Sequence, residues 1–474
     1  MEGIKEGDLR VITLTNSYRF PPQFRTSDSN VVESELRVIN DLFWIRLCMM
    51  GDLGFSEAYM YGEVECNDLV SLFKAIFLLI LSHVFLKNRE TLFNTVSYAS
   101  SLFTIPQKLT SLRFLNTISN SQSNISAHYD LSNAMFAGFL SEDMTYSCAI
   151  FEDLDGDICS DRQNHLSVPM SRKQPLTGEH TYSGVDGSAS NPFFDMNVLQ
   201  DELHEAQLRK LNHVIDRARI SSGHRVLEIG SGWGSLAILI AKRFHDTTVD
   251  TLTLSVQQQI LAQARVEGAG LQDRINVHLM DYRAMPSSWR SSFDRVISIE
   301  MIENVGAEFL AEYWRTIDWA LKKDDGAGVV QVITIPEARF ERYAGEIDFI
   351  RKWVFFPGGL LPTPTILLQT MEKGSSGRLI VDSVSNIGPH YARTLREWRR
   401  RFLDQFKSVI VPALKAEHPS VMDGPKGEEE IQIFKRKWLC NCYCEVGFAT
   451  RMLGDHIITF TREGYDQYGC NVFQ

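Results

Sequence analysis

Residues 225–234 of this chain read RVLEIGSGWG, an apolar run that contains Glu228 and is followed at once by Gly230, Gly232 and Gly234. Glycine lets a backbone turn tightly after a strand and leaves the N–H groups of the next helix open to a ligand. The spacing GxGxG differs from the GxGxxG fingerprint of dinucleotide-binding folds. The stretch therefore predicts a strand, a ligand-binding turn and a helix, and the alternative is a tight turn that binds nothing.

Short β-branched runs recur after this turn, with helical segments between them. The expected strands are residues 225–229, 247–252, 275–279, 293–299 and 329–335, and the runs 379–387 and 456–461 complete a seven-stranded sheet. Strands that alternate with helices are typical of a parallel, doubly wound sheet. We therefore predict an α/β fold with a Rossmann-like sheet.

The rest of the chain divides by composition into three regions. Residues 1–88 have a helical period of apolar side chains at Val38, Leu42, Ile45 and Met49 and predict a helical accessory domain. Residues 89–126 read as a polar connector, and residues 127–474 form the main domain, with a mobile insertion at 153–197. The apolar run 75–86 is shorter than the roughly 20 residues of a membrane span. A buried core helix, an interfacial helix and a span are the three interpretations of that run.

Composition excludes several classes of function. The 48 Lys and Arg against 59 Asp and Glu give a net charge of −11, which opposes binding to nucleic acid. The eight cysteines include no CxxC pair, so neither a disulfide scaffold nor a metal site is expected. The first ten residues carry five charges and no secretory signal, so we expect a cytoplasmic protein.

Side chains at the ends of the first three strands suggest the ligand. Glu228 can pair with a cationic amino group, and Thr253 and Gln258 offer neutral hydrogen bonds to a ribose. Asp281 can accept from an exocyclic amine, and the ring of Tyr282 can lie beside a purine. Together with the glycine turn, these residues predict S-adenosylmethionine (SAM) as a methyl donor.

Several further stretches resemble the cyclopropane-fatty-acyl-phospholipid synthase family. They are GDLGFSEAYM (51–60), HYDLSN (128–133), MTYSC (144–148), EMIENVG (300–306), FPGG (356–359), PHYARTL (389–395) and CEVGF (444–448). The resemblance spans roughly residues 51–448, with its main interruption at 153–197. It implies a SAM-dependent methyltransferase that acts on the cis double bond of acyl chains in phospholipids and forms cyclopropane fatty acids.

The same resemblance implies roles for individual residues. Glu303 would help to hold a bound bicarbonate that accepts a proton, and Cys148 and Cys444 would be active-site groups rather than nucleophiles. Without the resemblance, either cysteine would be interpreted as a small buried hydrophobe. Three residues would close over the cofactor: Tyr129, Tyr146 and Ser147.

Two positions depart from the bacterial pattern. Gln331 stands where many bacterial members have histidine, and plant-type members look similar to this chain around that position. Arg399 matches a later tyrosine that binds bicarbonate in the family. Gln331 can hydrogen-bond an anion and Arg399 can hold one by charge, so both are expected at the catalytic site. These departures leave a methyl branch without ring closure as an alternative product.

The substrate class also has alternatives. Relatives of this fold methylate soluble acceptors, which would give an N-methyl product, and a catalytically silent lipid-binding protein would keep the same fold. Residues 393–407 carry a net charge of +4, either as a solvated face or as a contact with anionic lipid headgroups. We expect a peripheral association with a phospholipid membrane, and the sequence leaves the oligomeric state, including a dimer, open.

Overall fold

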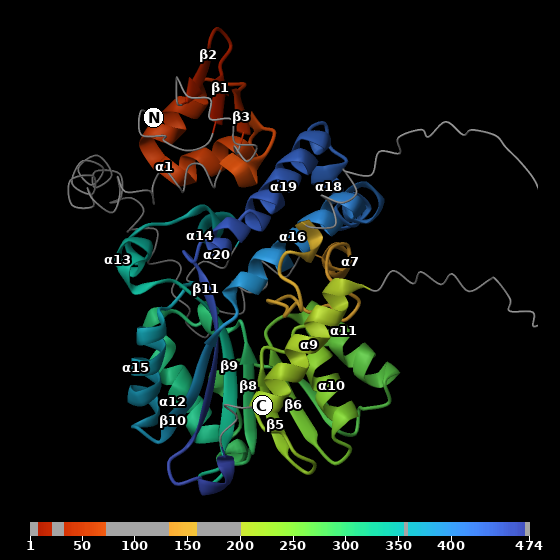
Figure 1. Ribbon diagram of the computed structural model, residues 1–474. Helices are drawn as coiled ribbons and strands as arrows, with labels where there is room; N and C mark the ends of the chain where they lie inside the picture. The colour runs from red at the N-terminus through yellow and green to blue at the C-terminus, as the bar shows by residue number, and fades with distance from the viewer. Residues whose placement is uncertain (1–7, 21–32, 73–131, 159–200, 355–358, 470–474) are drawn as a thin grey trace, which may run out of the picture.

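The computed structural model describes residues 8–20, 33–72, 132–158, 201–354 and 359–469 (Figure 1). The predicted connector 89–126, the apolar run 75–86 and Tyr129 lie outside these residues, as does most of the predicted insertion at 153–197. Among the described helices, none combines the length and the apolar character that a membrane crossing requires.

The main domain is built on a seven-stranded sheet with the order β10-β11-β9-β8-β5-β6-β7. Its strands are β5 (Arg225–Ile229), β6 (Thr248–Thr253), β7 (Ile275–Leu279), β8 (Arg295–Ile299), β9 (Ala327–Thr334), β10 (Leu379–Asn386) and β11 (Gly454–Arg462). The predicted α/β fold is confirmed. The sheet is mixed rather than wholly parallel, because β11 runs antiparallel to both of its neighbours.

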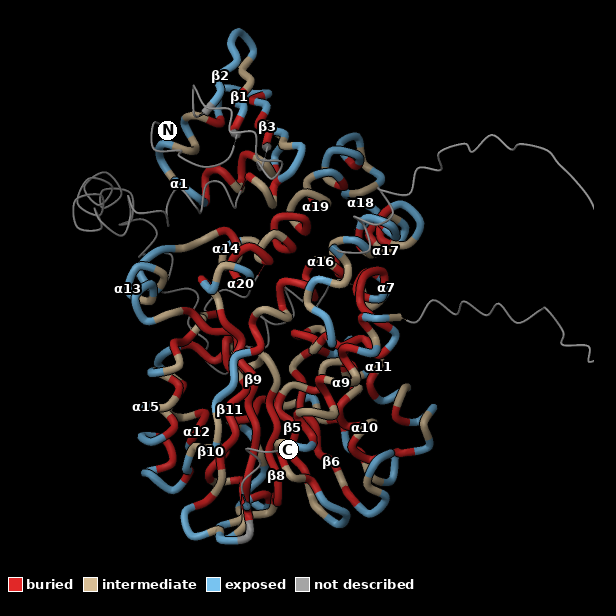
Figure 2. The backbone as a smooth tube through the Cα atoms, in the orientation of Figure 1, coloured by how far each residue is buried: buried red, intermediate tan, exposed pale blue. Residues whose placement is uncertain are grey.

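Helices cover both faces of this sheet (Figure 1). On one face lie α9 (Glu202–Arg217), α10 (Ser235–Arg243) and α11 (Val256–Gly268), and on the other lie α12 (Leu310–Ala320) and α15 (Pro364–Ser375). The central strands β5, β6, β8 and β9 are almost entirely buried, whereas the edge strands β7 and β10 are partly exposed (Figure 2). Burial on both faces explains why the central strands read as continuous apolar runs rather than alternating ones.

A further group of helices lies beyond the carboxyl ends of the central strands (Figure 1). Its members are α7 (Asn133–Ala137), α13 (Glu337–Gly345), α14 (Phe349–Trp353), α16 (Gly388–Gln405), α17 (Val411–Glu417), α18 (Pro419–Met422), α19 (Gly427–Cys442) and α20 (Glu445–Ala449). Parallel sheets bind ligands at these strand ends, so this group of helices covers the expected site.

The N-terminal unit corrects the prediction of a helical domain over residues 1–88. Its described part is a four-stranded sheet, order β2-β1-β3-β4, packed against the helix α1 (Leu42–Met60). The strands are β1 (Asp8–Ile12), β2 (Ser17–Phe20), β3 (Glu33–Val38) and β4 (Val64–Cys66). The periodic residues Leu42, Ile45 and Met49 do lie on a helix, but their side chains are exposed rather than in its core.

The two units meet through α1, α14 and α19. Leu53 and Met60 of α1 pack in one cluster with Phe349 and Cys440. At the centre of this contact, the buried carboxylate of Glu57 accepts hydrogen bonds from Lys352 Nζ at 2.5 Å and Trp353 Nε1 at 3.0 Å. The interface therefore combines an apolar cluster with a buried, hydrogen-bonded acid.

Candidate active site

The glycine turn between β5 and α10 borders a partly open cavity. Gly230 and Gly232 have positive φ angles of 102° and 47°, and no atom lies within 4 Å of the place that a Gly232 Cβ would occupy. Gly234 does not border the cavity. It is the residue that directly precedes α10, and it has a φ of 86°. The other predicted cofactor residues that border the cavity are Tyr146, Ser147, Glu228, Thr253, Gln258, Asp281 and Tyr282.

Glu228 is a buried acid at the end of β5. Its Oε2 accepts a hydrogen bond from Thr251 Oγ1 at 2.6 Å, and burial raises the pKa of its carboxyl to about 8. A cationic amino group in the cavity would favour the ionised form and lower that pKa. The residue therefore fits its predicted role as partner of the amino group of SAM.

The side chains predicted for the ribose and the purine also lie at the cavity. Thr253 Oγ1 donates to Gln258 Oε1 at 2.7 Å, which leaves the Gln258 amide N–H groups available as neutral donors. The buried hydroxyl of Tyr282 has no hydrogen-bond partner within the described chain. Asp281 is more constrained than predicted, because its carboxylate already accepts from Arg283 Nε at 2.9 Å and Nη2 at 2.6 Å. The set fits SAM, with Asp281 limited to its remaining lone pairs.

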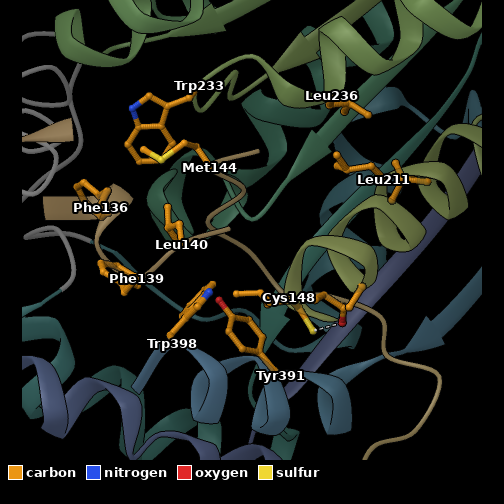
Figure 3. Packing of buried hydrophobic residues seen from close by; sticks show 14 of the residues in the cluster. Phe136, Phe139, Leu140, Met144, Cys148, Leu211, Trp233, Leu236, Tyr391 and Trp398 are labelled. Atoms are coloured by element: carbon orange, nitrogen blue, oxygen red, sulfur yellow. Dashed lines mark hydrogen bonds between the residues drawn. The ribbon is translucent and has the colours of Figure 1, made fainter. Parts of the chain in front are cut away.

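A second group of polar side chains borders the same cavity at Glu300, which directly follows β8. Its Oε1 accepts from the backbone N–H of Cys148 at 2.7 Å and from Gln331 Nε2 at 2.9 Å. Its Oε2 accepts from the Tyr391 hydroxyl at 2.8 Å. Gln331 Nε2 also donates to Asp455 Oδ2 at 2.8 Å. We call these five residues the Glu300 cluster, and Figure 3 shows two of them, Cys148 and Tyr391, next to each other.

The Glu300 cluster holds two acids close enough to share a proton. Burial raises the pKa of both carboxyls, and the charge of Glu300 raises that of Asp455 further. Donors on Cys148, Gln331 and Tyr391 favour ionised Glu300, so Asp455 is the protonated partner. Lys210 of α9 also borders the cavity, and its Nζ donates to Ser147 Oγ at 2.6 Å.

Glu303 lies one turn beyond Glu300, in η4 (Ile302–Asn304). Its side chain is buried, and its Oε1 accepts from the Ile333 N–H at 2.5 Å. Its Oε2 has no partner within the described residues. Burial and the neighbouring Glu300 raise the pKa of Glu303 well above the ordinary value.

The two predicted cysteines have different places. Cys148 belongs to the Glu300 cluster through its backbone, and its buried thiol has a pKa well above the ordinary value because of desolvation. Cys444 begins α20, and burial raises the pKa of its thiol to about 12. Within the described chain, Cys444 neither borders the cavity nor hydrogen-bonds to the cluster. Both groups are thiols rather than thiolates at pH 7, as expected for residues that are not nucleophiles.

Arg399 is not placed as predicted. Its Nη1 lies 2.7 Å from Glu445 Oε2, and its guanidinium stacks over the ring of Tyr443. Tyr391, two turns earlier in α16, reaches the Glu300 cluster in its place.

The predicted basic face of residues 393–407 is also largely neutralised. Arg393 is fully buried, with its Nη2 lying 2.5 Å from Glu202 Oε2, and Arg396 pairs with Asp157 at 2.6 Å. Arg401 pairs with Asp201. These arginines bind the main domain together rather than form an open cationic surface.

Sequence reasoning missed four residues at this site: Lys210, Glu300, Tyr391 and Asp455. Two of them stand in stretches quoted for the resemblance, Glu300 in EMIENVG and Tyr391 in PHYARTL. The place of Glu300 at the carboxyl end of a central strand is the signal that could have identified it.

Known proteins resemble this chain over most of its length. The family model described as mycolic acid cyclopropane synthetase matches residues 117–180 and 190–418. The tuberculostearic acid methyltransferase UfaA1 of Mycobacterium tuberculosis is 31% identical over 430 residues, which cover 88% of this chain and 81% of that protein. The cyclopropane-fatty-acyl-phospholipid synthase of Escherichia coli K12 is 28% identical over 379 residues, which cover 79% and 78% of the two chains.

One solved structure illustrates the likeness in fold. It is the mycolic acid cyclopropane synthase CmaA1 complexed with SAH and CTAB, with a TM-score of 0.51 and 23% sequence identity. The superposition covers 72% of this chain and 98% of that chain.

Proposed function

Because the chain belongs to the mycolic acid cyclopropane synthetase family, we propose that it transfers a methyl group from SAM to the cis double bond of unsaturated acyl chains in phospholipids. By this membership it is a SAM-dependent lipid methyltransferase. The proposed product is a cyclopropane fatty acid. The observation that carries the proposal is one cavity bordered both by the glycine turn and by the hydrogen-bonded carboxyl of Glu300.

The cavity has features that this reaction needs. When bound, SAM supplies an electrophilic methyl group, whereas an alkene is a weak nucleophile that must be aligned and kept from water. Tyr146 borders the cavity. The centre of its ring lies 5.0 Å from that of Trp398 and 5.4 Å from that of Phe136. Figure 3 shows Phe136, Phe139, Trp233 and Trp398 gathered in this region. Aromatic faces suit an acyl chain and stabilise nearby positive charge.

A methyl-branched lipid is the second candidate product. The relative at 31% identity is named for tuberculostearic acid rather than for a cyclopropane. Loss of a proton from the methyl group closes the ring, whereas loss of a proton from the lipid chain leaves a methyl-branched chain that keeps a double bond. The two products therefore share the methyl transfer that precedes the proton loss.

The protein would meet its substrate at a membrane surface, where phospholipids reside. The ion pairs of α16 leave little free positive charge for headgroups. We therefore propose peripheral association through the acyl chain that enters the cavity, rather than through a basic helix face.

The test is incubation of the purified protein with SAM labelled in its methyl group and vesicles of oleoyl phospholipid. Mass spectrometry of the fatty acids should find the label in the acyl chain, and NMR of the product distinguishes ring protons from a branch. Vesicles of saturated phospholipid are the control and should stay unlabelled. Absence of label in the lipid across several unsaturated phospholipids would contradict the proposal.

Two further measurements separate the alternatives. A methyltransferase for soluble acceptors would remain in the supernatant when vesicles are sedimented at moderate salt. A silent lipid-binding protein would bind SAM or lipid in calorimetry and never release a methylated product.

A further inference from the structure

The bicarbonate implied by the resemblance does not fit the site as the chain builds it. The groups that would hold such an anion, the Cys148 backbone N–H and Gln331, already donate to Glu300 at 2.7 Å and 2.9 Å. The Tyr391 hydroxyl donates to the same carboxylate.

We propose that the carboxylate of Glu300 replaces the dissolved anion and is itself the base that removes a proton from the transferred methyl group. This inference rests on the proposed function and names the proton acceptor for its last step. The three donors hold the carboxylate in one orientation at the wall of the cavity that the glycine turn also borders.

The backbone conformation of Glu300 indicates that its side chain has a functional role. Glu300 has a φ of 47°, in the left-handed region where a residue other than glycine is held at a cost of about 1 kcal/mol. Such strain at the end of a strand, together with a carboxylate held by three hydrogen bonds, is typical of a functional position. Glycine at position 300 would avoid both the backbone strain and the desolvation of a carboxylate. Neither the fold nor stability therefore explains a glutamate there.

Glu300 is the best placed of the three acids. Glu303 and Asp455 do not border the cavity among the described residues, whereas Glu300 does. Glu303 is tied to the Ile333 N–H, and Asp455 donates its proton within the cluster rather than accepting one. A base must reach the proton that it abstracts, so geometry selects Glu300.

The chemistry balances without any further reactant. The π electrons of the lipid double bond form the new bond to the methyl carbon, while the sulfonium sulfur keeps the electron pair of the bond that breaks. The neighbouring lipid carbon becomes cationic. The electron pair of one methyl C–H bond then closes the ring, and its proton goes to a Glu300 oxygen and later to water.

The test compares the wild-type protein with Glu300→Gly in buffer depleted of carbon dioxide, with and without added bicarbonate or formate. We expect wild-type turnover to be unchanged by either anion. Turnover of Glu300→Gly in depleted buffer should fall by at least about 100-fold, the usual effect of removing a general base. Added bicarbonate or formate should restore part of it, because the donors of Cys148, Gln331 and Tyr391 are then free to bind an anion.

Glu300→Gln is the matched control, since it fills the same volume and cannot accept the proton. It should be inactive and should not be rescued by any anion. Affinity for SAM, measured by calorimetry, should be similar in all three proteins. Wild-type turnover that requires added bicarbonate, or Glu300→Gly turnover that persists in depleted buffer, would overturn the inference.

Anion binding can be measured without turnover. In NMR of ¹³C-bicarbonate, exchange broadening should appear with Glu300→Gly and be absent with the wild type. Binding to the wild type at the cluster would overturn the inference even if no lipid were methylated. A wild type that methylates no lipid and yet excludes bicarbonate would instead contradict the proposed function alone.

Discussion

Glu228 links cofactor affinity to pH. Its pKa of about 8 in the ligand-free protein means that the side chain is mostly neutral at pH 7, whereas its partner in SAM is cationic. Affinity for SAM should therefore increase as pH rises from about 6 to 7.5, by up to about tenfold per pH unit. Calorimetric titrations across this range check the prediction. Glu228→Gln should bind SAM more weakly and without that slope, and an equal slope in the variant would show that another group titrates.

The same shift affects the stability of the ligand-free protein. The folded pKa of Glu228 lies above the ordinary 4.5, so the folded chain binds more protons than the unfolded chain between about pH 4.5 and 8. Its contribution to the free energy of unfolding is therefore present at low pH and is lost as pH rises through that range.

Glu303 should be essential for turnover and dispensable for cofactor binding. Glu303→Gln keeps an oxygen that can accept from the Ile333 N–H, so the fold is retained. The amide cannot carry the carboxyl proton beside Glu300, and we expect turnover to be abolished while SAM affinity changes little. Turnover assays and calorimetry on one preparation check both parts. Loss of SAM binding would show that the role is misassigned.

The cofactor side of the site could be predicted from the sequence, and the proton-accepting side largely could not. Glu228 and Thr253 lie at the ends of strands that the apolar runs locate, and Tyr282 follows another such strand. Glu300, Tyr391 and Asp455 come from segments up to 155 residues apart, and only the folded chain brings them together. Arg399 was assigned from the resemblance, and a sequence match does not reveal that Glu445 pairs with this side chain.

At the scale of elements, α16 is held by arginines that lie inside the protein. Arg393 is fully buried against Glu202 and Asp157, with its guanidinium 4.5 Å from the centre of the Phe151 ring. Arg393→Met should lower the free energy of unfolding by about 2 kcal/mol, because the hydrogen bond to the Asp153 backbone carbonyl and the ion pair with Glu202 are lost. Urea unfolding midpoints measure this.

Arg400→Met is the control on the same helix. Its side chain is 60% exposed and pairs with Glu397, so the change should be below about 0.5 kcal/mol. Equal effects of the two substitutions would mean that burial does not determine the contribution of these arginines.

Two strands of the main sheet were predicted with the bounds that the structure gives them. The expected run 225–229 coincides with β5, and 275–279 coincides with β7. The N-terminal strands were missed because β3 alternates buried Leu36 and Val38 with polar residues, and because the periodicity used there spans the boundary between β3 and α1. A short alternating strand is a weak signal beside a helix of 19 residues.

At the scale of the whole molecule, Glu57 joins the N-terminal unit to the main domain. Glu57→Ala removes the acceptor of Lys352 and Trp353, so we expect the contact to loosen at a cost of about 2 kcal/mol. Faster proteolysis of the N-terminal unit and a red shift in tryptophan fluorescence would report it. Glu346→Ala, which removes an exposed pair with Arg342, should change neither signal. Intact resistance of Glu57→Ala to proteolysis would contradict the prediction.

The left-handed backbone after β8 has a consequence beyond the site itself. Glycine and glutamate are both compatible with that conformation, so a single substitution at position 300 can exchange a base carried by the chain for one drawn from solution. An enzyme that takes its base from solution works at a rate that depends on the concentration of dissolved bicarbonate. That concentration in turn depends on the pH of the solution and on its exchange of carbon dioxide with the gas phase. With Glu300 in place, the modification of lipids by this protein would proceed independently of that supply.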